Sequence, residues 1–158
     1  LRRFDSNFKL NPPLRTETDI QTLIAGLKDG TLDVLASDHS PQAPEKKLRE
    51  LDQAPFGIVG LETALGINCT YLLHRGIMTM SQMVDAMSCK PAKVFHLPGG
   101  TLARGSLGDV TVFDPNRTWT VDPKTFKSKG RNTPYGGHQL TGQARLTVVG
   151  GRVVYRAS

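Results

Sequence analysis

Cysteine, aromatic side chains and long apolar runs are scarce in this chain of 158 residues. The two cysteines cannot form the dense disulfide framework of small secreted domains, so we expect reduced thiols in the core and a cytoplasmic protein. Aromatic residues make up 6% of the chain and do not interleave with the basic ones, which argues against a platform for stacking nucleic-acid bases. Because no run of about 18 apolar residues occurs, the sequence predicts no membrane span.

A strong charge of one sign is also lacking, although the formal net charge is +6. The densest basic group, Lys46-Lys47-Leu48-Arg49, is followed directly by an acidic residue, Glu50. Mixed charge of this kind is typical of a solvated face, so we expect no nucleic-acid partner. The mild basic bias favours the approach of an anionic substrate. The hydrophobic content of 38% and the charged content of 22% suit a globular protein.

The four histidines do not form a metal-binding pattern. No His-x-His segment and no plausible lysine-bearing metal motif precedes Asp38. His74 and His96 lie in segments with helical spacing, and His138 lies in a glycine-rich loop. None of these three has a second His or Cys at metal-ligand spacing, so we interpret all three as structural.

The most informative segment is Thr31-Leu-Asp-Val-Leu-Ala-Ser-Asp38-His-Ser-Pro41. A short apolar run ends there in a carboxylate, an imidazole, a hydroxyl and a proline. Buried parallel strands have such runs, and in a β/α barrel the catalytic side chains lie where the strands end. Asp38 is therefore a candidate catalytic residue. The alternative is that Asp38 only stabilises the turn before Ser-Pro.

Segments on both sides of Asp38 have a recognisable order and spacing. They are Lys9-Leu-Asn11-Pro-Pro-Leu-Arg15, Ala54-Pro-Phe56-Gly57-Ile-Val-Gly60-Leu-Glu62, Gly105-Ser-Leu-Gly-Asp109, Ser128-Lys-Gly-Arg-Asn132 and Thr147-Val-Val-Gly-Gly151. Together with the Asp38 segment they resemble the C-terminal half of bacterial dihydroorotases, which are cyclic amidohydrolases of the amidohydrolase superfamily. The resemblance covers essentially the whole chain.

The resemblance implies an α/β fold: the C-terminal part of a metal-dependent (β/α)8 barrel, followed by strands of a small β-sandwich. We place the barrel portion at residues 1–98 and the sandwich segment at residues 99–158. A complete barrel takes about 250 residues, and this chain begins Leu-Arg-Arg with no initiator Met. We therefore expect a C-terminal fragment whose N-terminal half, with the other metal ligands, is missing.

Hydrophobic spacing predicts the elements of both portions. The barrel portion should contain strands at 4–10 and up to residue 38, a helix around 20–27 ended by Gly30, a helix over about 61–76, a helix from Thr79 or Ser81 and a short last helix from Pro91. The third helix has an apolar face of Met80, Met83, Val84 and Met87, which we interpret as core. The sandwich portion should contain strands at 110–113, 118–121, 146–149 and 152–155, the last two joined by the hairpin turn Gly150-Gly151.

The resemblance also assigns roles to single residues. Asp38 corresponds to a metal ligand that takes a proton from the metal-bridging hydroxide and delivers it to the leaving ring nitrogen. Asn11 corresponds to a side chain that hydrogen-bonds the substrate ring, although Asn before Pro is also typical of a turn. Phe56 and Gly57 correspond to a loop whose backbone meets the substrate, although Gly57 could equally serve an unusual turn. Gln42 stands where the family usually has His holding the substrate carboxylate.

Two further polar residues near these segments have simpler interpretations. His39 adjoins Asp38, and we interpret it as a support for the loop because the family's metal histidines lie elsewhere. Glu62 is expected in the first turn of a helix, where interaction with the helix dipole explains it.

The resemblance implies a zinc-dependent enzyme, binuclear in the full-length parent, that interconverts N-carbamoyl-L-aspartate and dihydroorotate in pyrimidine synthesis. The fragment alone should be inactive, and a homo-oligomer is expected. One alternative is another ring-opening cyclic amidohydrolase, such as an allantoinase or hydantoinase. A second is a metal-free homologue that serves as a structural partner, for example of aspartate transcarbamoylase. Gln42, which cannot become cationic, favours this second alternative.

Overall fold

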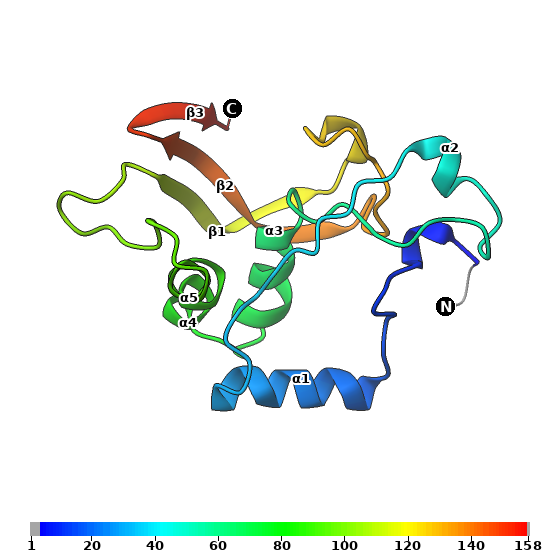
Figure 1. Cartoon of the computed structure of the whole chain (residues 1–158), viewed down its shortest axis with the longest axis horizontal. Coiled ribbons are helices and arrows are strands. Elements are labelled where there is room, and N and C mark those ends of the chain that lie inside the picture. The colour runs from blue at the N-terminus through cyan, green and yellow to red at the C-terminus, as the bar shows by residue number, and fades with distance from the viewer. Residues whose placement is uncertain (1–3, 158) are drawn as a thin grey trace.

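The computed structural model describes residues 4–157, which form helices packed below one antiparallel sheet of order β1-β2-β3 (Figure 1). The helical elements are η1 (Ser6–Phe8), α1 (Glu17–Asp29), α2 (Pro44–Lys47), α3 (Ala64–Asn68), η2 (Cys69–Leu73), α4 (Met80–Val84), η3 (Asp85–Cys89), α5 (Lys90–Val94) and η4 (Pro123–Thr125). The strands are β1 (Val110–Thr120), β2 (Gln139–Val149) and β3 (Arg152–Arg156). The chain is therefore α/β in content, as expected.

Helix α1 confirms its prediction from local sequence. Thr16 and Asp19 form a reciprocal capping box at its start, and Gly30 ends it in the left-handed conformation, with φ of +83°. The helix nevertheless buries none of its residues. Ile20 and Leu23, which belong to its apolar stripe, are exposed. In Figure 1 this helix lies at the edge of the molecule, far from the sheet.

The two strands predicted before residue 40 are wrong. Residues 4–10 contain the short helix η1, capped by the Asp5 side chain, and otherwise irregular backbone. Residues 32–38 form no strand, although the apolar run is present. A strand requires a hydrogen-bonded neighbour, and within residues 4–157 the only such pairing in this region is an isolated parallel bridge between His39 and Ile58.

The next two helices occur where periodicity placed them, with differences at their ends. The helical segment α3–η2 begins at Ala64, so Leu61 precedes it and is exposed. Thr79 caps α4 through a capping box with Gln82, as predicted. Pro91 does not start a separate helix, because α4, η3 and α5 run on without interruption. Proline lacks an N–H and crowds the preceding turn, and the π-helical segment η3 just before it relieves that crowding.

The sheet contains fewer and longer strands than predicted. Residues 110–113 and 118–121 were expected as two strands, but β1 continues through both, with a register irregularity between Asp114 and Thr118. Pro115 lies at that irregularity, where a missing N–H is tolerated. The predicted hairpin is confirmed: β2 and β3 pair through Gly150 and Gly151, both with positive φ.

The core lies between the sheet and helix α3–η2. Val59, Val121, Phe126 and Leu140 are buried together. The helix approaches β2 closely because Gly142 lies against Cys69, and any Cβ at Gly142 would overlap with the cysteine side chain. This packing holds Val59, and through it the end of the loop over residues 54–58, against the sheet.

Several expectations concern the chain as a whole. Cys69 and Cys89 are both free thiols, as expected, and burial raises the pKa of Cys69. Within residues 4–157 no helix is long and apolar enough to cross a membrane. The same residues contain one sheet, so the second sheet that a sandwich requires is not among them. Likewise they contain no barrel strands.

Candidate functional site

The segment around Asp38 lies beside the segment around Gly57. His39 and Ile58 form the parallel bridge, and the Ser40 N–H donates to the Ile58 carbonyl at 2.8 Å. Asp38 itself is exposed and has a φ of +44°, in the left-handed region that non-glycine residues rarely adopt. Asp tolerates this region better than most residues. The backbone thus turns sharply at the candidate catalytic carboxylate.

Gly57 is required by both its conformation and its neighbours. Its φ is +110°, and a Cβ at this position would overlap with the Ser40 side chain. Its N–H donates to the Lys9 carbonyl at 3.0 Å. Gly57 therefore allows close contact with two other segments of the chain. These contacts explain the glycine at position 57 independently of any role in substrate binding.

One buried amide joins the two loops that contain Gln42 and Gly57. The Asn132 side chain accepts a hydrogen bond from the Gln42 N–H at 2.9 Å. Its Nδ2 donates to the carbonyls of Ser40 and Gly57, both at 3.0 Å. Its backbone carbonyl also accepts from the Val59 N–H at 2.9 Å. Asn132 is 5% exposed, so these contacts are shielded from water.

Gln42 and Phe56 are in direct contact. Gln42 Nε2 donates to the Phe56 carbonyl at 3.1 Å, and the Phe56 ring is 51% exposed. The Lys9 ammonium lies 4.8 Å from the centre of that ring and donates to the carbonyls of Leu51 and Asp52. Asn11 follows two residues after Lys9 and is exposed. The structure thus brings Gln42, Phe56 and Gly57 together, and it places the Asn11 segment next to them.

His39, Ser128 and Glu62 form a cluster that resembles a hydrolytic triad but has different hydrogen bonding. His39 Nδ1 accepts from the backbone N–H groups of Gly60 and Leu61, at 3.1 and 3.3 Å. The ring proton therefore belongs on Nε2, which lies 3.4 Å from Ser128 Oγ. Ser128 Oγ donates to Glu62 Oε1 at 2.6 Å. Because this hydroxyl gives its proton to a carboxylate, it is not prepared for nucleophilic attack through His39.

The expectation for His39 agrees with these contacts, and that for Glu62 is wrong. His39 holds the backbone of the Gly60 turn. Glu62 precedes α3, which begins at Ala64, so it does not lie in the first helical turn. Its carboxylate instead accepts two hydrogen bonds from Ser128. Burial acts to raise the pKa of Glu62, but these hydrogen bonds and the nearby His39 together lower it below its ordinary value.

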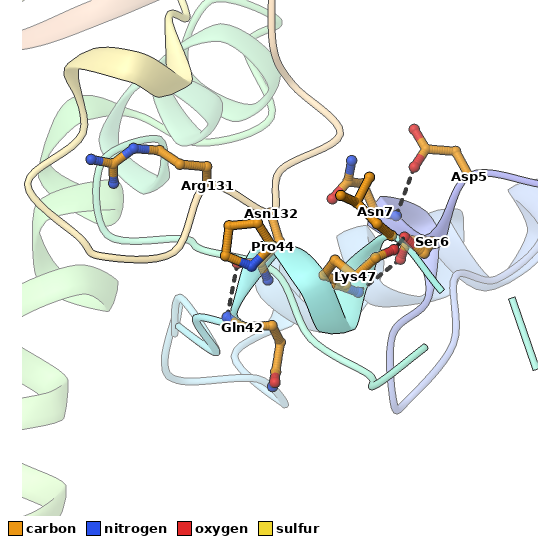
Figure 2. Close-up of a pocket in the computed structure, with 9 residues that line it drawn as sticks. Asp5, Ser6, Asn7, Gln42, Pro44, Lys47, Arg131 and Asn132 are labelled. Atoms are coloured by element: carbon orange, nitrogen blue, oxygen red, sulfur yellow. Dashed lines mark hydrogen bonds between the residues drawn. The ribbon is translucent and has the colours of Figure 1, made fainter. Parts of the chain in front are cut away.

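A pocket of about 220 Å³ lies behind the Gln42 loop, between η1, α2 and residues 131–132 (Figure 2). Lys47 lines it and is 6% exposed. Its ammonium donates to the carbonyls of Ser6 and Pro55, at 2.7 and 2.9 Å, and so ties η1 and the Pro55 loop to α2. Burial lowers the pKa of Lys47. Figure 2 shows the Gln42 side chain pointing away from Asn132, while its backbone N–H faces the Asn132 amide.

The described residues contain no complete set of zinc ligands. Catalytic zinc sites use about three protein ligands plus water, and Asp38 offers one carboxylate. Within residues 4–157 no group of three or more His, Cys, Asp or Glu side chains is arranged to bind a metal ion. Any complete metal site that includes Asp38 needs ligands from outside this part of the chain.

Sequence reasoning missed the contacts made by Asn132, Lys47 and Ser128. Asn132 and Ser128 belong to a segment that carries the resemblance, Ser128-Lys-Gly-Arg-Asn132, but nothing in its spacing indicates which groups it contacts. Their partners lie far away in sequence, since Asn132 bonds to residues 40, 42 and 57. Lys47 lies in a charged run that is typical of a solvated face.

Comparison with known proteins supports the sequence-based resemblance. The profile of the amidohydrolase family matches residues 4–155. The dihydroorotase of Shouchella clausii is 47% identical over 152 residues, and that of Geobacter metallireducens is 46% identical over 156 residues. These alignments cover 96% and 99% of this chain and 36% and 37% of the relatives. The chain is thus similar to dihydroorotases along nearly its whole length, which confirms the resemblance.

Solved structures of hydantoinases have the same fold as this chain. The D-hydantoinase (dihydropyrimidinase) from Thermus sp. superposes with a TM-score of 0.87 at 31% identity, covering 96% of this chain and 34% of that one. The L-hydantoinase from Arthrobacter aurescens superposes with a TM-score of 0.86 at 33% identity, covering 94% of this chain and 34% of its own. The chain spans about a third of the length of the relatives it matches. On the evidence of the family profile and these relatives, the chain belongs to the amidohydrolase family.

Proposed function

We propose that this chain is part of a dihydroorotase, which interconverts dihydroorotate and N-carbamoyl-L-aspartate. The observation that carries the proposal is the identity of 46–48% with several dihydroorotases over 96% or more of the chain. The alignments with these relatives extend across the Asp38, Asn11 and Phe56-Gly57 segments. Since the chain spans about a third of their length, the activity belongs to an intact protein that includes an N-terminal part.

In the proposed hydrolytic direction, water attacks the ring carbonyl carbon of dihydroorotate and the bond from that carbon to the ring nitrogen breaks. Asp38 accepts a proton from the attacking water and delivers it to the departing nitrogen, so the ring opens to a ureido group and a carboxylic acid, which releases the second proton of the water as it ionises. The exposed position of Asp38, at a sharp backbone turn next to the His39–Ile58 bridge, suits a group that meets a substrate.

The other proposed contacts surround the ring and its carboxylate. Asn11 donates and accepts hydrogen bonds at the cyclic amide. Gln42 donates to the substrate carboxylate, and the backbone of Phe56 and Gly57 completes that side of the site. Support comes from the direct contact of Gln42 with Phe56 and from the position of the Lys9–Asn11 segment next to Gly57.

We propose zinc as the cofactor, bound as a pair in the intact protein with Asp38 as one ligand. Zinc supplies Lewis-acid polarisation and lowers the pKa of a bound water.

The proposal also includes a barrel portion at residues 1–98, a sandwich segment at residues 99–158 and a cytoplasmic location. Two observations support a partner surface in the N-terminal part: Ile20 and Leu23 of α1 are exposed, and the segment before Asp38 forms no strand within residues 4–157. A homo-oligomer, or association with aspartate transcarbamoylase, stays a prediction.

The direct test is turnover of a substrate panel by the zinc-loaded intact protein. We expect ring opening of dihydroorotate and ring closure of N-carbamoyl-L-aspartate, with at most weak activity on hydantoin and allantoin. Preferential turnover of hydantoin would favour the hydantoinase alternative, which the fold similarity to hydantoinases keeps open. An intact protein that binds no zinc and opens none of these rings would favour the metal-free alternative.

A further inference from the structure

We propose that Asn132 is a positioning residue for the substrate, because its side-chain amide holds the Gln42 loop and the Phe56-Gly57 loop in one arrangement. The inference rests on the proposed function of these loops and adds a residue that does not itself face the substrate. Asn132 comes from the segment after η4, about ninety residues beyond Gln42 in the chain.

The orientation of the Asn132 amide is fixed by its partners. The Gln42 backbone N–H can only donate, so it requires the amide oxygen. The carbonyls of Ser40 and Gly57 can only accept, so both require the NH₂ group. A flipped amide would place an oxygen against two carbonyls and an NH₂ against an N–H. Only one orientation satisfies all three partners, and each of the two loops contributes at least one of them.

The surroundings show that the segment around Asn132 fits closely against these loops. A Cβ at Gly130 would lie 2.7 Å from Asn132 Oδ1 and 2.8 Å from Pro41 Cβ, so only glycine permits this approach. The backbone of Asn132 also bonds Val59, which belongs to the buried core. The loops are therefore tied through Asn132 to the buried core that contains Val59. Loss of the amide would leave one N–H and two carbonyls without these partners.

These contacts bear directly on the groups proposed to meet the substrate. The Gln42 side chain reaches the Phe56 carbonyl, and its backbone is held by Asn132 on the other side. The Gly57 carbonyl is held by the same amide. If the two loops separated, the Gln42 donor and the Phe56-Gly57 backbone would lose their relative position. Substrate binding should then suffer more than proton transfer by Asp38.

The test compares Asn132→Ala with Thr133→Val in the zinc-loaded intact protein. Thr133 is the matched control, because it is equally buried and adjacent, but among residues 4–157 its hydroxyl bonds only to the nearby Tyr135 N–H. For Asn132→Ala we expect KM for dihydroorotate to rise about 10- to 100-fold, as misplaced binding groups can cause, with a smaller change in kcat and unchanged zinc content. Thr133→Val should keep the wild-type KM. Equal changes in both variants, or a loss confined to kcat, would overturn the proposal.

A second readout separates this inference from the proposed function. Amide hydrogen exchange should become at least about 10-fold faster at Gln42 in Asn132→Ala. It should stay slow in Thr133→Val, which leaves the Asn132 amide and its bond to the Gln42 N–H in place. The Val121 amide, which bonds His138 in the core, serves as the internal reference. If wild-type protein lacks dihydroorotase activity, the proposed function fails. Slow exchange at Gln42 in Asn132→Ala would overturn the positioning role whatever the activity.

Discussion

The sheet over residues 110–157 and the region over residues 4–58 differ in strand pairing and in how far their side chains are buried. In the sheet, β2 pairs along most of its length with β1 and β3, and Leu140 is fully buried beneath it. In the N-terminal region, α1 buries no residue and the segment around Asp38 pairs through one bridge, between His39 and Ile58. Yet that less-packed region contains all the residues proposed to meet the substrate. Packing and the proposed chemistry thus lie in different regions of the chain, and the Asn132 side chain joins them through its hydrogen bonds to residues 40, 42 and 57.

The difference indicates where each region finds its stability. The sheet and helix α3–η2 pack against each other, so each buries apolar side chains within this chain. The capping box and glycine end of α1 specify a helix locally, but Ile20 and Leu23 of its apolar stripe stay exposed in the described part of the chain. Helical stability in proteins comes mainly from packing of an amphipathic face. The N-terminal region should therefore depend on surfaces outside this chain more than the sheet does.

The largest expected effect follows from replacing one carboxylate by an amide in each of the two regions. Asp38→Asn keeps the shape and the tolerance for positive φ, but it removes the proposed proton acceptor. We expect turnover of dihydroorotate by the intact protein to fall by about 10²–10⁴-fold or more, with the fold unchanged. The matched control is Asp114→Asn in β1, whose side chain can still accept from the Asn116 N–H. Near-normal turnover in Asp38→Asn would remove Asp38 from the chemistry.

A second comparison concerns stability alone. Leu140 is fully buried, whereas Leu23 in α1 is 52% exposed. We expect Leu140→Ala to lower the free energy of unfolding by about 2–5 kcal/mol, and Leu23→Ala to change it by about 0.5 kcal/mol or less in the isolated chain. Denaturant unfolding of the 158-residue chain measures both. In the intact protein Leu23→Ala should cost more, and an equally small effect there would mean that α1 stays unpacked.

A third, smaller effect should follow from Gln42→His. If Gln42 meets the substrate carboxylate, a histidine that is partly protonated should strengthen binding by about 1–3 kcal/mol, as charge-assisted hydrogen bonds do. Stability should change less, because the Gln42 backbone contact with Asn132 is retained. The measurement is KM for dihydroorotate against pH for both proteins. Identical KM values across the titration range of histidine would place Gln42 outside the site.

The smallest expected effect is the pH dependence contributed by Glu62. Its pKa is lowered in the folded chain, so its stabilising contribution is complete above the ordinary value of 4.5 and is lost as pH falls through the folded value. Between about pH 6 and pH 3 the wild type should therefore lose more stability than Glu62→Gln, by less than about 1 kcal/mol because burial of the carboxylate opposes the effect of its hydrogen bonds. Glu45→Gln, at an exposed position in α2, should behave like the wild type.

The sequence predicted local features well, because their causes lie within a few residues. The end of α1 at Gly30, the capping box of α4 and the turn at Gly150-Gly151 are set by neighbouring side chains and by positive φ. The apolar run ending at Asp38 led to a wrong strand prediction. An apolar pattern favours a strand but does not specify the neighbouring strand, and within residues 4–157 no ladder forms there. The merging of two predicted strands into β1 depends on pairing with β2, about thirty residues away.

In the candidate site, too, some residues could be identified from the sequence, whereas the contacts between them could not. Asp38, Asn11, Gln42, Phe56 and Gly57 were identified through the resemblance, and the structure brings the last three together. The contacts that organise them were not predictable, because Asn132 and Ser128 act across the fold and give no periodic pattern. Glu62 was misassigned for the same reason: its partner is Ser128, and its neighbours in sequence do not explain it.

The most direct test of this account is zinc binding and turnover by the isolated 158-residue chain beside the intact protein. One carboxylate from Asp38 cannot complete a zinc site that needs about three protein ligands. We therefore predict that the isolated chain retains no stoichiometric zinc after dialysis and opens no dihydroorotate, while the intact protein does both. Stoichiometric zinc and ring opening by the isolated chain would contradict the account, because the site would then be complete within these residues.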